Sequence, residues 1–560
     1  MYEVKNVIQN IFSKIKSITA VGDRLFYASF AFLLALKSGY YFFKYYPIID
    51  DWFLFLAAST YKNKWSEVVV AQNKLQLRPL AGLLDAYVTG GFLANNLSLL
   101  YFLLTAMLCS SAIIFHKTLK NNNINVGPLF FIVFALTPIS AEALYWIGAS
   151  SRIIPSILLI AIAGCCADIF AKTGSKKTLT AFAVTSLLSV GLYEATLPIL
   201  IIYPAIILFL NRKNGGNPLK KLLPAAIPVV FALGMFVYYR FNGDNPDIAS
   251  RGGLVTQGFL DHFRNVFLRF ANVFTMVNLR LSGHALKVGA KTIVKDRAFI
   301  FAFFTVASSV VFGCIVYKNE KKKENATLKS IFKHFIIGLL LFAAGLSLNF
   351  LLSGVRISLR VVYISFIGLG VMLDAVFLKI KLPVIKSVFI SLIALLCVTA
   401  NVGELAEYKI TSETDEAIAK TIIETEGRGN LVDPEKIGFI LGAVDTYVSG
   451  TGLYFEHIKA STEVYASVTG SVMYYIGGPR INNIMTVRDG ETFNLHFIDK
   501  FYEMYYFYGL EVDDDGKYRA VKLIPMLDAN DAADFFTLDD RLYGGIVPAD
   551  DGVKYYFKLY

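Results

Sequence analysis

Two adjacent carboxylates, Asp50 and Asp51, follow the first long apolar segment and directly precede Trp52. Ionisable groups beside a bilayer are costly to hold, so an acidic pair at the end of an apolar segment is a candidate site. Such a pair can act as a general base toward a hydroxyl group, or it can hold Mg²⁺ or Mn²⁺. It can equally be an interfacial pair that only solvates the end of the segment. The pair alone leaves these alternatives open.

Further charged side chains lie next to the ends of other apolar segments, namely Arg78, Glu142, Arg152, Glu194, Arg356 and Arg360. Arginine stays charged at any working pH and binds two oxygens of a phosphate at once. We expect Arg356 and Arg360 to be the first phosphate-binding candidates, followed by Arg152 and Arg78. Arg78 could instead pair with an acid of the first loop. Glu142 is expected to orient an acceptor or to pair with Arg152, and Glu194 to make an internal ion pair.

The elements that carry these residues belong to a membrane protein. The chain has 560 residues, of which 55% are hydrophobic and 17% are charged, whereas soluble domains contain about 25% charged residues. The first apolar run lacks a small-residue cleavage site, so we expect it to remain as a signal anchor. All five cysteines lie in apolar runs, which predicts neither a disulfide nor a cysteine metal site.

About eleven apolar segments have lengths compatible with crossing a bilayer. They are Leu25–Phe43, Leu93–Phe115, Gly127–Pro138, Ile153–Ala171, Leu179–Gly191, Leu197–Leu210, Leu222–Tyr239, Ala298–Tyr317, His334–Leu352, Val361–Leu378 and Val384–Val402. Short Lys-rich loops predict a cytoplasmic N-terminus by the positive-inside rule, and eleven crossings then place the C-terminus outside. The same parity exports the segment 243–297 despite its eight Lys and Arg residues, which conflicts with the rule.

After Val402 the composition changes to that of a soluble domain. Residues 403–560 contain 27 acidic and 14 basic residues and so have a net charge of −13. Because the whole chain has a net charge of +11, residues 1–402 have a net charge of +24. Because the positive charge lies in short loops between apolar segments, it indicates membrane topology and no nucleic-acid partner. We therefore predict a polytopic α-helical domain over 1–402 and a small extracytoplasmic α/β domain over 403–560. In the second domain, 404–426 predicts a helix that ends at Gly427, Ile437–Leu441 a strand, and 512–518 a hairpin turn.

Taken in order, several short motifs resemble those of the GT-C superfamily of polytopic membrane glycosyltransferases. They are the acidic pair in the first outer loop, Arg78-Pro79-Leu80, and Thr137-Pro138-Ile139-Ser140-Ala141-Glu142-Ala143-Leu144-Tyr145-Trp146 leading to Arg152. The later stretch Arg356-Ile357-Ser358-Leu359-Arg360 is consistent with them. Thr137 departs from the pattern, because some members of the superfamily carry His there.

The resemblance implies a GT-C-like fold in the plasma membrane and a hexosyltransferase that uses a polyprenyl-phosphate sugar as donor. The acceptor would be a cell-surface polysaccharide or a protein, as for bacterial envelope transferases and protein O-mannosyltransferases. Asp50 or Asp51 would be the base or a ligand of Mg or Mn. The substrate-binding residues would be Arg78, Glu142, Arg152, Glu194, Arg356 and Arg360.

Two other classes of protein have the same overall pattern. A transporter or flippase for a lipid-linked glycan would also contain many spans and buried charges. An envelope assembly protein would use its spans as an anchor and its acidic C-terminal region to bind a partner. Converting Asp50 and Asp51 to Asn is expected to abolish sugar transfer but to spare the binding function of an assembly protein.

Overall fold

A computed structural model describes most of the helical part of the chain and the strands that follow it. The described residues are 21–48, 51–52, 54, 78–92, 96–211, 224, 226–242, 258–320, 327–352, 357–433, 436–441, 447–448, 453–454, 465–477, 481, 484–487, 492–494, 505–512, 518–526, 535–538, 541–549 and 552–556. Asp50 and Arg356 lie outside these ranges, so their predicted roles stay predictions.

The chain is an α-helical membrane protein. Among the described residues, six helices are long and apolar enough to cross a bilayer: α6 (Leu97–Asn121), α9 (Ile147–Thr173), α17 (Phe299–Glu320), α18 (Leu328–Leu351), Leu359–Phe377 and α21 (Pro383–Val432). The segment Leu359–Phe377 consists of α19 (Leu359–Val362), a 3₁₀ turn and α20 (Phe366–Phe377). The remaining long helices are α2 (Val21–Gly39), α10 (Lys176–Leu192), α11 (Leu197–Leu210), α13 (Ala226–Asn242), α15 (Phe259–Asn272) and α16 (Asn278–Lys295).

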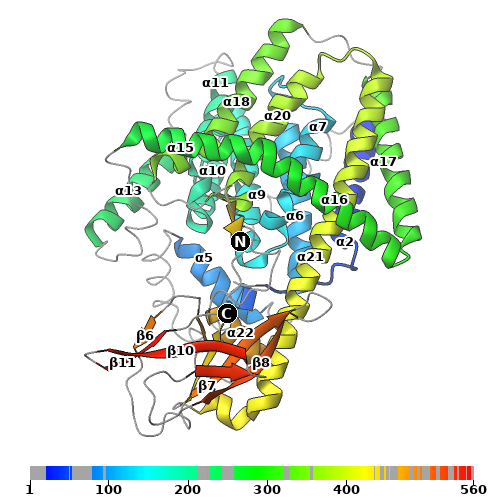
Figure 1. The fold of residues 1–560 in the computed structure, drawn as a ribbon. Helices are drawn as coiled ribbons and strands as arrows, with labels where there is room; N and C mark the ends of the chain where they lie inside the picture. The colour runs from blue at the N-terminus through cyan, green and yellow to red at the C-terminus, as the bar shows by residue number, and fades with distance from the viewer. Residues whose placement is uncertain are drawn as a thin grey trace.

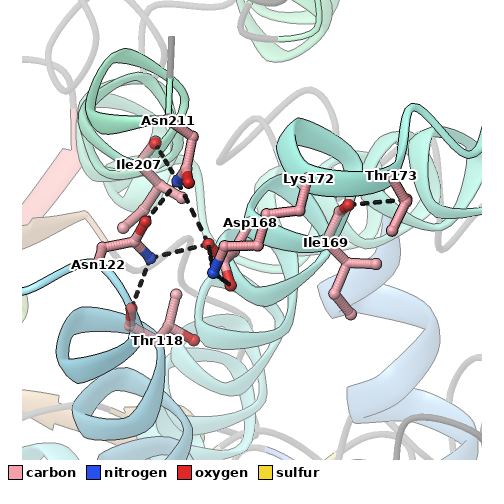
Figure 2. Close-up of polar contacts among 8 residues, drawn as sticks. All are labelled: Thr118, Asn122, Asp168, Ile169, Lys172, Thr173, Ile207 and Asn211. Carbon is pink, nitrogen blue, oxygen red and sulfur yellow. Dashed lines mark hydrogen bonds and ion pairs between the residues drawn. The ribbon is translucent and has the colours of Figure 1, made fainter. Parts of the chain in front are cut away.

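A polar cluster joins the ends of three helices, and we call it the asparagine–aspartate cluster (Asn122, Asp168, Lys172, Asn211; Figure 2). Asn122, Asp168 and Asn211 are buried, whereas Lys172 is exposed. Asp168 on α9 accepts hydrogen bonds from the side-chain amides of Asn122, at 2.9 Å, and Asn211, at 3.3 Å. Lys172, one turn further along α9, pairs with the same carboxylate at 2.8 Å. Because the cluster satisfies groups at the ends of α6, α9 and α11, it fixes these three ends together.

The predicted segment Gly127–Pro138 is helical only as far as Leu136. It forms α7 (Pro128–Phe131) and the π-helical turn η3 (Ile132–Leu136), breaks at Thr137-Pro138, and resumes as α8 (Ser140–Leu144). Proline has no backbone N–H and its ring clashes with the preceding turn, which accounts for the break. Nine helical residues rise by only about 14 Å, less than half of a bilayer core.

Side chains from other helices satisfy the carbonyl groups that this break releases. The Tyr363 hydroxyl donates to Phe134 O at 2.7 Å, and the Asn401 amide donates to Leu136 O at 2.8 Å. Between them, the buried Lys37 ammonium donates to Ala135 O at 2.7 Å and also to the Ser140 hydroxyl. An unsatisfied carbonyl in an apolar layer costs several kcal/mol, so these donors make the broken helix stable.

The broken segment nevertheless covers the full length of the neighbouring helix α9. Before it, Asn122 contacts Asp168 near the end of α9, and after it the chain enters the start of α9 at Ile147. Gly148 and Asp168 are about 30 Å apart at 1.5 Å per residue. The segment 123–146 therefore traverses a distance comparable to a bilayer core.

The amphipathic region before Phe299 forms α15 and α16, which run obliquely across the other helices in Figure 1. Val266 and Phe270 of α15 are buried, whereas Leu260 and Phe267 are exposed. Helix α16 crosses α21 so closely that a Cβ on Gly403 of α21 would collide with the backbone of α16. Small residues at such crossings allow two helix backbones to approach.

Helix α21 connects the helical part to the strands. The sequence predicts a span ending at Val402 followed by a separate helix, but the helical backbone runs unbroken through Val402 to a kink at Gly427, where φ is 71°. The part before this kink rises by about 65 Å at 1.5 Å per residue, and Figure 1 shows α21 descending from the other helices to the sheet. The predicted helix end at Gly427 is present, whereas no break separates the predicted span from the following helix at Val402.

The described residues beyond α21 form an eight-stranded sheet, helix α22 (Tyr465–Tyr475) and two strands of a three-stranded sheet, whose third strand is β1 (Ile357–Ser358). The strands are β2 (Ile437–Leu441), β3 (Tyr447–Val448), β4 (Leu453–Tyr454), β5 (Ile484–Val487), β6 (Thr492–Asn494), β7 (Tyr505–Val512), β8 (Tyr518–Met526), β9 (Phe535–Leu538), β10 (Arg541–Ala549) and β11 (Gly552–Tyr556). The larger sheet has the order β5-β2-β7-β8-β9-β10-β11-β6. Strand β2 is parallel to β5 and β7, and α22 lies between β2 and β5 in the chain. The predicted strand Ile437–Leu441 is present. Strands β7 and β8 pair antiparallel with Val512 opposite Tyr518, and the predicted turn between them lies outside the described residues.

Candidate functional site

Arg78 forms a two-pronged ion pair with Glu194. Its Nε and Nη2 atoms lie 2.5 and 2.9 Å from the two oxygens of that carboxylate, and its guanidinium covers the Tyr193 ring at 4.5 Å. Arg78 directly precedes α5 (Pro79–Leu83), and Glu194 begins the turn η4 (Glu194–Thr196) after α10. The pair therefore ties the start of α5 to the connection between α10 and α11.

A second ion pair joins Arg152 to Asp85. Arg152 lies in the second turn of α9, and Asp85 lies in the π-helical segment η1 (Leu84–Phe92), which continues α5. Both side chains are largely buried, with exposed fractions of 12% and 4%. Asp85 was not singled out in the sequence, although an acid seven residues after Arg78 in an apolar stretch was a visible signal. Sequence reasoning had offered Glu142 as one partner of Arg152.

Glu142, on the short helix α8, instead contacts the segment that carries Arg360. Its Oε2 atom accepts a hydrogen bond from the backbone N–H of Arg360 at 2.8 Å, and the glutamate is buried. The Arg360 guanidinium covers the ring of Trp146, at 4.0 Å from the ring centroid. A stacked guanidinium keeps its N–H groups in its own plane, where they can reach an anion.

Three arginines act on one tyrosine. Burial raises the pKa of the Tyr193 hydroxyl, whereas the positive charges of Arg78, Arg360 and Arg152 lower it and Glu194 raises it. Charges influence a pKa in this way only when they are close to the group. Arg78 lies over the Tyr193 ring, and the charges of Arg152 and Arg360 also act on its hydroxyl. We call these three residues, which lie up to 282 positions apart in the chain, the arginine cluster.

Asp51 is buried, with 1% of its surface exposed. Its carboxylate accepts hydrogen bonds from the Tyr45 hydroxyl at 2.5 Å, from Ile48 N at 3.0 Å and from Gly148 N at 2.6 Å. Tyr45 in turn accepts a hydrogen bond from Ile147 N at 2.8 Å. Free N–H groups at a helix start attract negative charge, so Asp51 caps the N-terminus of α9 from the first loop.

The segment 142–152 contacts three of these groups. Glu142 and Trp146 contact Arg360, Gly148 contacts Asp51, and Arg152 contacts Asp85. The structure thus brings together the described sequence-predicted residues of the first loop, of α9 and of the segment after β1 (Ile357–Ser358). The pair between Arg78 and Glu194 joins this group through its proximity to Tyr193.

Among the described residues there is no group of three or more His, Cys, Asp or Glu side chains that could hold a metal ion. Asp50 lies outside those residues, so a role for it in holding Mg or Mn stays a prediction. The four described carboxylates of the site, Asp51, Asp85, Glu142 and Glu194, each contact an arginine side chain or a backbone N–H group.

No family model, no curated protein and no solved structure matches this chain.

Proposed function

We propose that this protein is a membrane glycosyltransferase that moves a hexose from a polyprenyl-phosphate donor to an extracytoplasmic acceptor. The acceptor would be a cell-surface glycan, such as an envelope polysaccharide, or a protein. The observation that carries the proposal is the arrangement of Arg360 on Trp146, next to the α9 start that Asp51 of the first loop caps. A site for a lipid-linked phosphate needs arginine N–H donors beside a carboxylate.

The arginine cluster would bind the phosphate of the donor. In transfer, the acceptor hydroxyl attacks the anomeric carbon, the bond from that carbon to the phosphate oxygen breaks, and negative charge grows on the leaving phosphate. Stabilising this charge is commonly the largest electrostatic contribution to catalysis. Arg360 is the first candidate, because its charge lies on the Trp146 ring and Glu142 holds its backbone. Arg78, Arg152 and Arg356 would contribute to the same binding.

The two acids of the first loop would have different roles, one structural and one catalytic. Asp51 already accepts three hydrogen bonds and caps α9, which suits a residue that fixes the loop. Its neighbour Asp50 would then be the base that takes the proton of the acceptor hydroxyl, or a ligand of Mg or Mn. Glu142 and Glu194 would position Arg360 and Arg78 rather than contact the acceptor.

The proposed topology has eleven crossings, a cytoplasmic N-terminus and an extracytoplasmic α/β domain over 403–560. Contacts at the two ends of the helices support it. Asp23 on α2 pairs with Lys120 on α6, close to the asparagine–aspartate cluster, whereas Lys37 at the other end of α2 contacts the break before α8. Helices α10 and α11 connect these same two levels, from Ser175 to Tyr193 and back to Asn211.

The test is sugar release from a panel of polyprenyl-phosphate sugars by the purified protein in detergent, with and without Mg and Mn. We expect wild-type protein to consume one donor, Asp50→Asn to lose this activity with its fold intact, and Asp51→Asn to lose activity together with stability. Activity retained in both variants would remove the acidic pair from the chemistry.

A lipid-linked glycan transporter is the second candidate. The helix broken at Pro138 and the buried Lys37 beside it favour this alternative, because transporters commonly bind substrates at broken helices. Movement of a labelled lipid-linked sugar across proteoliposomes without release of the sugar would identify a transporter. An envelope assembly protein would do neither.

A further inference from the structure

Trp52, the residue after Asp51, is held by the region that follows the membrane helices. Its side chain is completely buried, and its indole N–H donates to the Asp415 carboxylate of α21 at 3.0 Å. The rings of Tyr474 and Tyr475, on α22, lie 5.7 and 5.8 Å from the indole ring. The end of the first loop is therefore packed between α21 and α22.

The backbone of α22 touches the backbone of Trp52 directly. A Cβ added to Gly470 would lie far inside van der Waals contact with the Trp52 carbonyl oxygen. Glycine is unfavourable in a helix interior by about 1 kcal/mol relative to alanine. Its presence here is explained by the close approach of the two backbones.

The same C-terminal region also holds the segment that carries Arg360. Strand β1 pairs in parallel with β4, with Ile357 opposite Leu453 and Ser358 opposite Tyr454. Arg360 follows β1 by two residues. Two separate contacts of the C-terminal region thus reach the two loops that the proposed mechanism requires, one next to Asp51 and one next to Arg360.

We infer that the region after α21 positions the site, with α22 holding the first loop through Gly470 and Trp52, and β4 holding the Arg360 segment. Trp52 and Gly470 are positioning residues: they act through the Asp51 cap on α9, and neither contacts the sugar. The inference concerns the proposed transferase and rests on that function for its effect on turnover. The docking itself can be measured without any substrate.

The test compares Gly470→Ala with Gly429→Ala in the full-length protein in detergent. Gly429 is a matched control on α21, because a Cβ there would meet no atom within 4 Å. Amide hydrogen exchange is measured for peptides covering 45–52 and 145–150, which include the Ile48 and Gly148 donors to Asp51. Donor consumption is measured on the same preparations.

We expect Gly470→Ala to speed exchange in both peptides by about tenfold or more, because it opens the local contact. Turnover should fall by about tenfold or more, since small displacements of catalytic groups are costly. Gly429→Ala should match wild type in both measurements. If Gly470→Ala does not fold, Trp52→Phe, which removes the donor to Asp415 but keeps an aromatic ring, provides the same comparison with a smaller increase in exchange.

Unchanged exchange in Gly470→Ala would overturn the docking, and faster exchange with wild-type turnover would overturn the positioning role. If wild-type protein consumed no donor, the proposed function would fail, while the exchange measurement would still decide whether α22 holds the first loop. The two failures are therefore distinguishable.

Discussion

Asp51→Asn should separate an anchoring acid from a catalytic one. In the wild-type protein the two oxygens of Asp51 accept from three donors, which are the Tyr45 hydroxyl and the backbone N–H groups of Ile48 and Gly148. An asparagine offers only one oxygen, and its NH₂ group would face at least one of these N–H donors. The change also removes the negative charge at the start of α9.

The expected cost follows from these contacts. A buried N–H that loses its acceptor costs about 1–3 kcal/mol, and loss of a good N-terminal cap costs about 0.5–2 kcal/mol. Because Asp51 is buried, little of this cost can be recovered by water. We expect a total destabilisation of about 2–4 kcal/mol, since the two contributions overlap at Gly148.

The assay is thermal unfolding of the purified protein in detergent, followed by tryptophan fluorescence, with Asp50→Asn as the matched control. Asp51→Asn should lower the unfolding midpoint by several degrees, whereas Asp50→Asn should leave it near the wild-type value and affect only turnover. An Asp51→Asn protein as stable as wild type would refute the anchoring role. Equal destabilisation by both variants would refute the proposal that Asp51 is structural and Asp50 catalytic.

Three further predictions concern the helices. Asp168→Ala should destabilise the protein by about 1–3 kcal/mol, because the buried Asn122 amide loses one acceptor while it keeps Thr118 O. Thr173→Ala on the same helix removes exposed hydrogen bonds to backbone and should be nearly neutral in thermal unfolding. Lys37→Met should cost about 2–4 kcal/mol by releasing carbonyls at the helix break, and a melting midpoint equal to wild type would contradict this. Arg78→Lys should lose the two-pronged pair and destabilise by about 1–3 kcal/mol; a double-mutant cycle with Glu194→Gln should show strong coupling, and additive effects would count against the pair.

Six of the predicted apolar segments coincide with helices long and apolar enough to cross a bilayer, because hydropathy reflects the solvent around each residue. Hydropathy does not report where a helix ends: the composition changes at Val402, whereas the helical backbone of α21 continues to Gly427. At Gly427 φ is 71°, a conformation that glycine adopts without steric cost, so this glycine correctly indicated where the helix breaks.

The partners of charged residues were less predictable. Arg78 and Arg152 were recognised as unusual from their places beside apolar segments, yet their partners Glu194 and Asp85 depend on how distant helices pack. Likewise, Pro138 marks a helix break in any sequence, but only the packing of α2 shows that Lys37 satisfies the released carbonyls. The sequence therefore shows which polar groups need a partner inside the protein, whereas the packing of the helices determines which residue is that partner.

The most direct test of the proposed transferase is donor consumption by wild type, Arg360→Ala and Arg428→Ala. Arg428 is an exposed arginine of α21 outside the arginine cluster, so it controls for loss of one positive charge. We predict that wild type and Arg428→Ala release sugar from one polyprenyl-phosphate donor, and that Arg360→Ala is slower by about 100-fold or more with its melting midpoint preserved. Turnover of Arg360→Ala at the wild-type rate, or no release by wild type from any donor in the presence of Mg and Mn, would contradict the account.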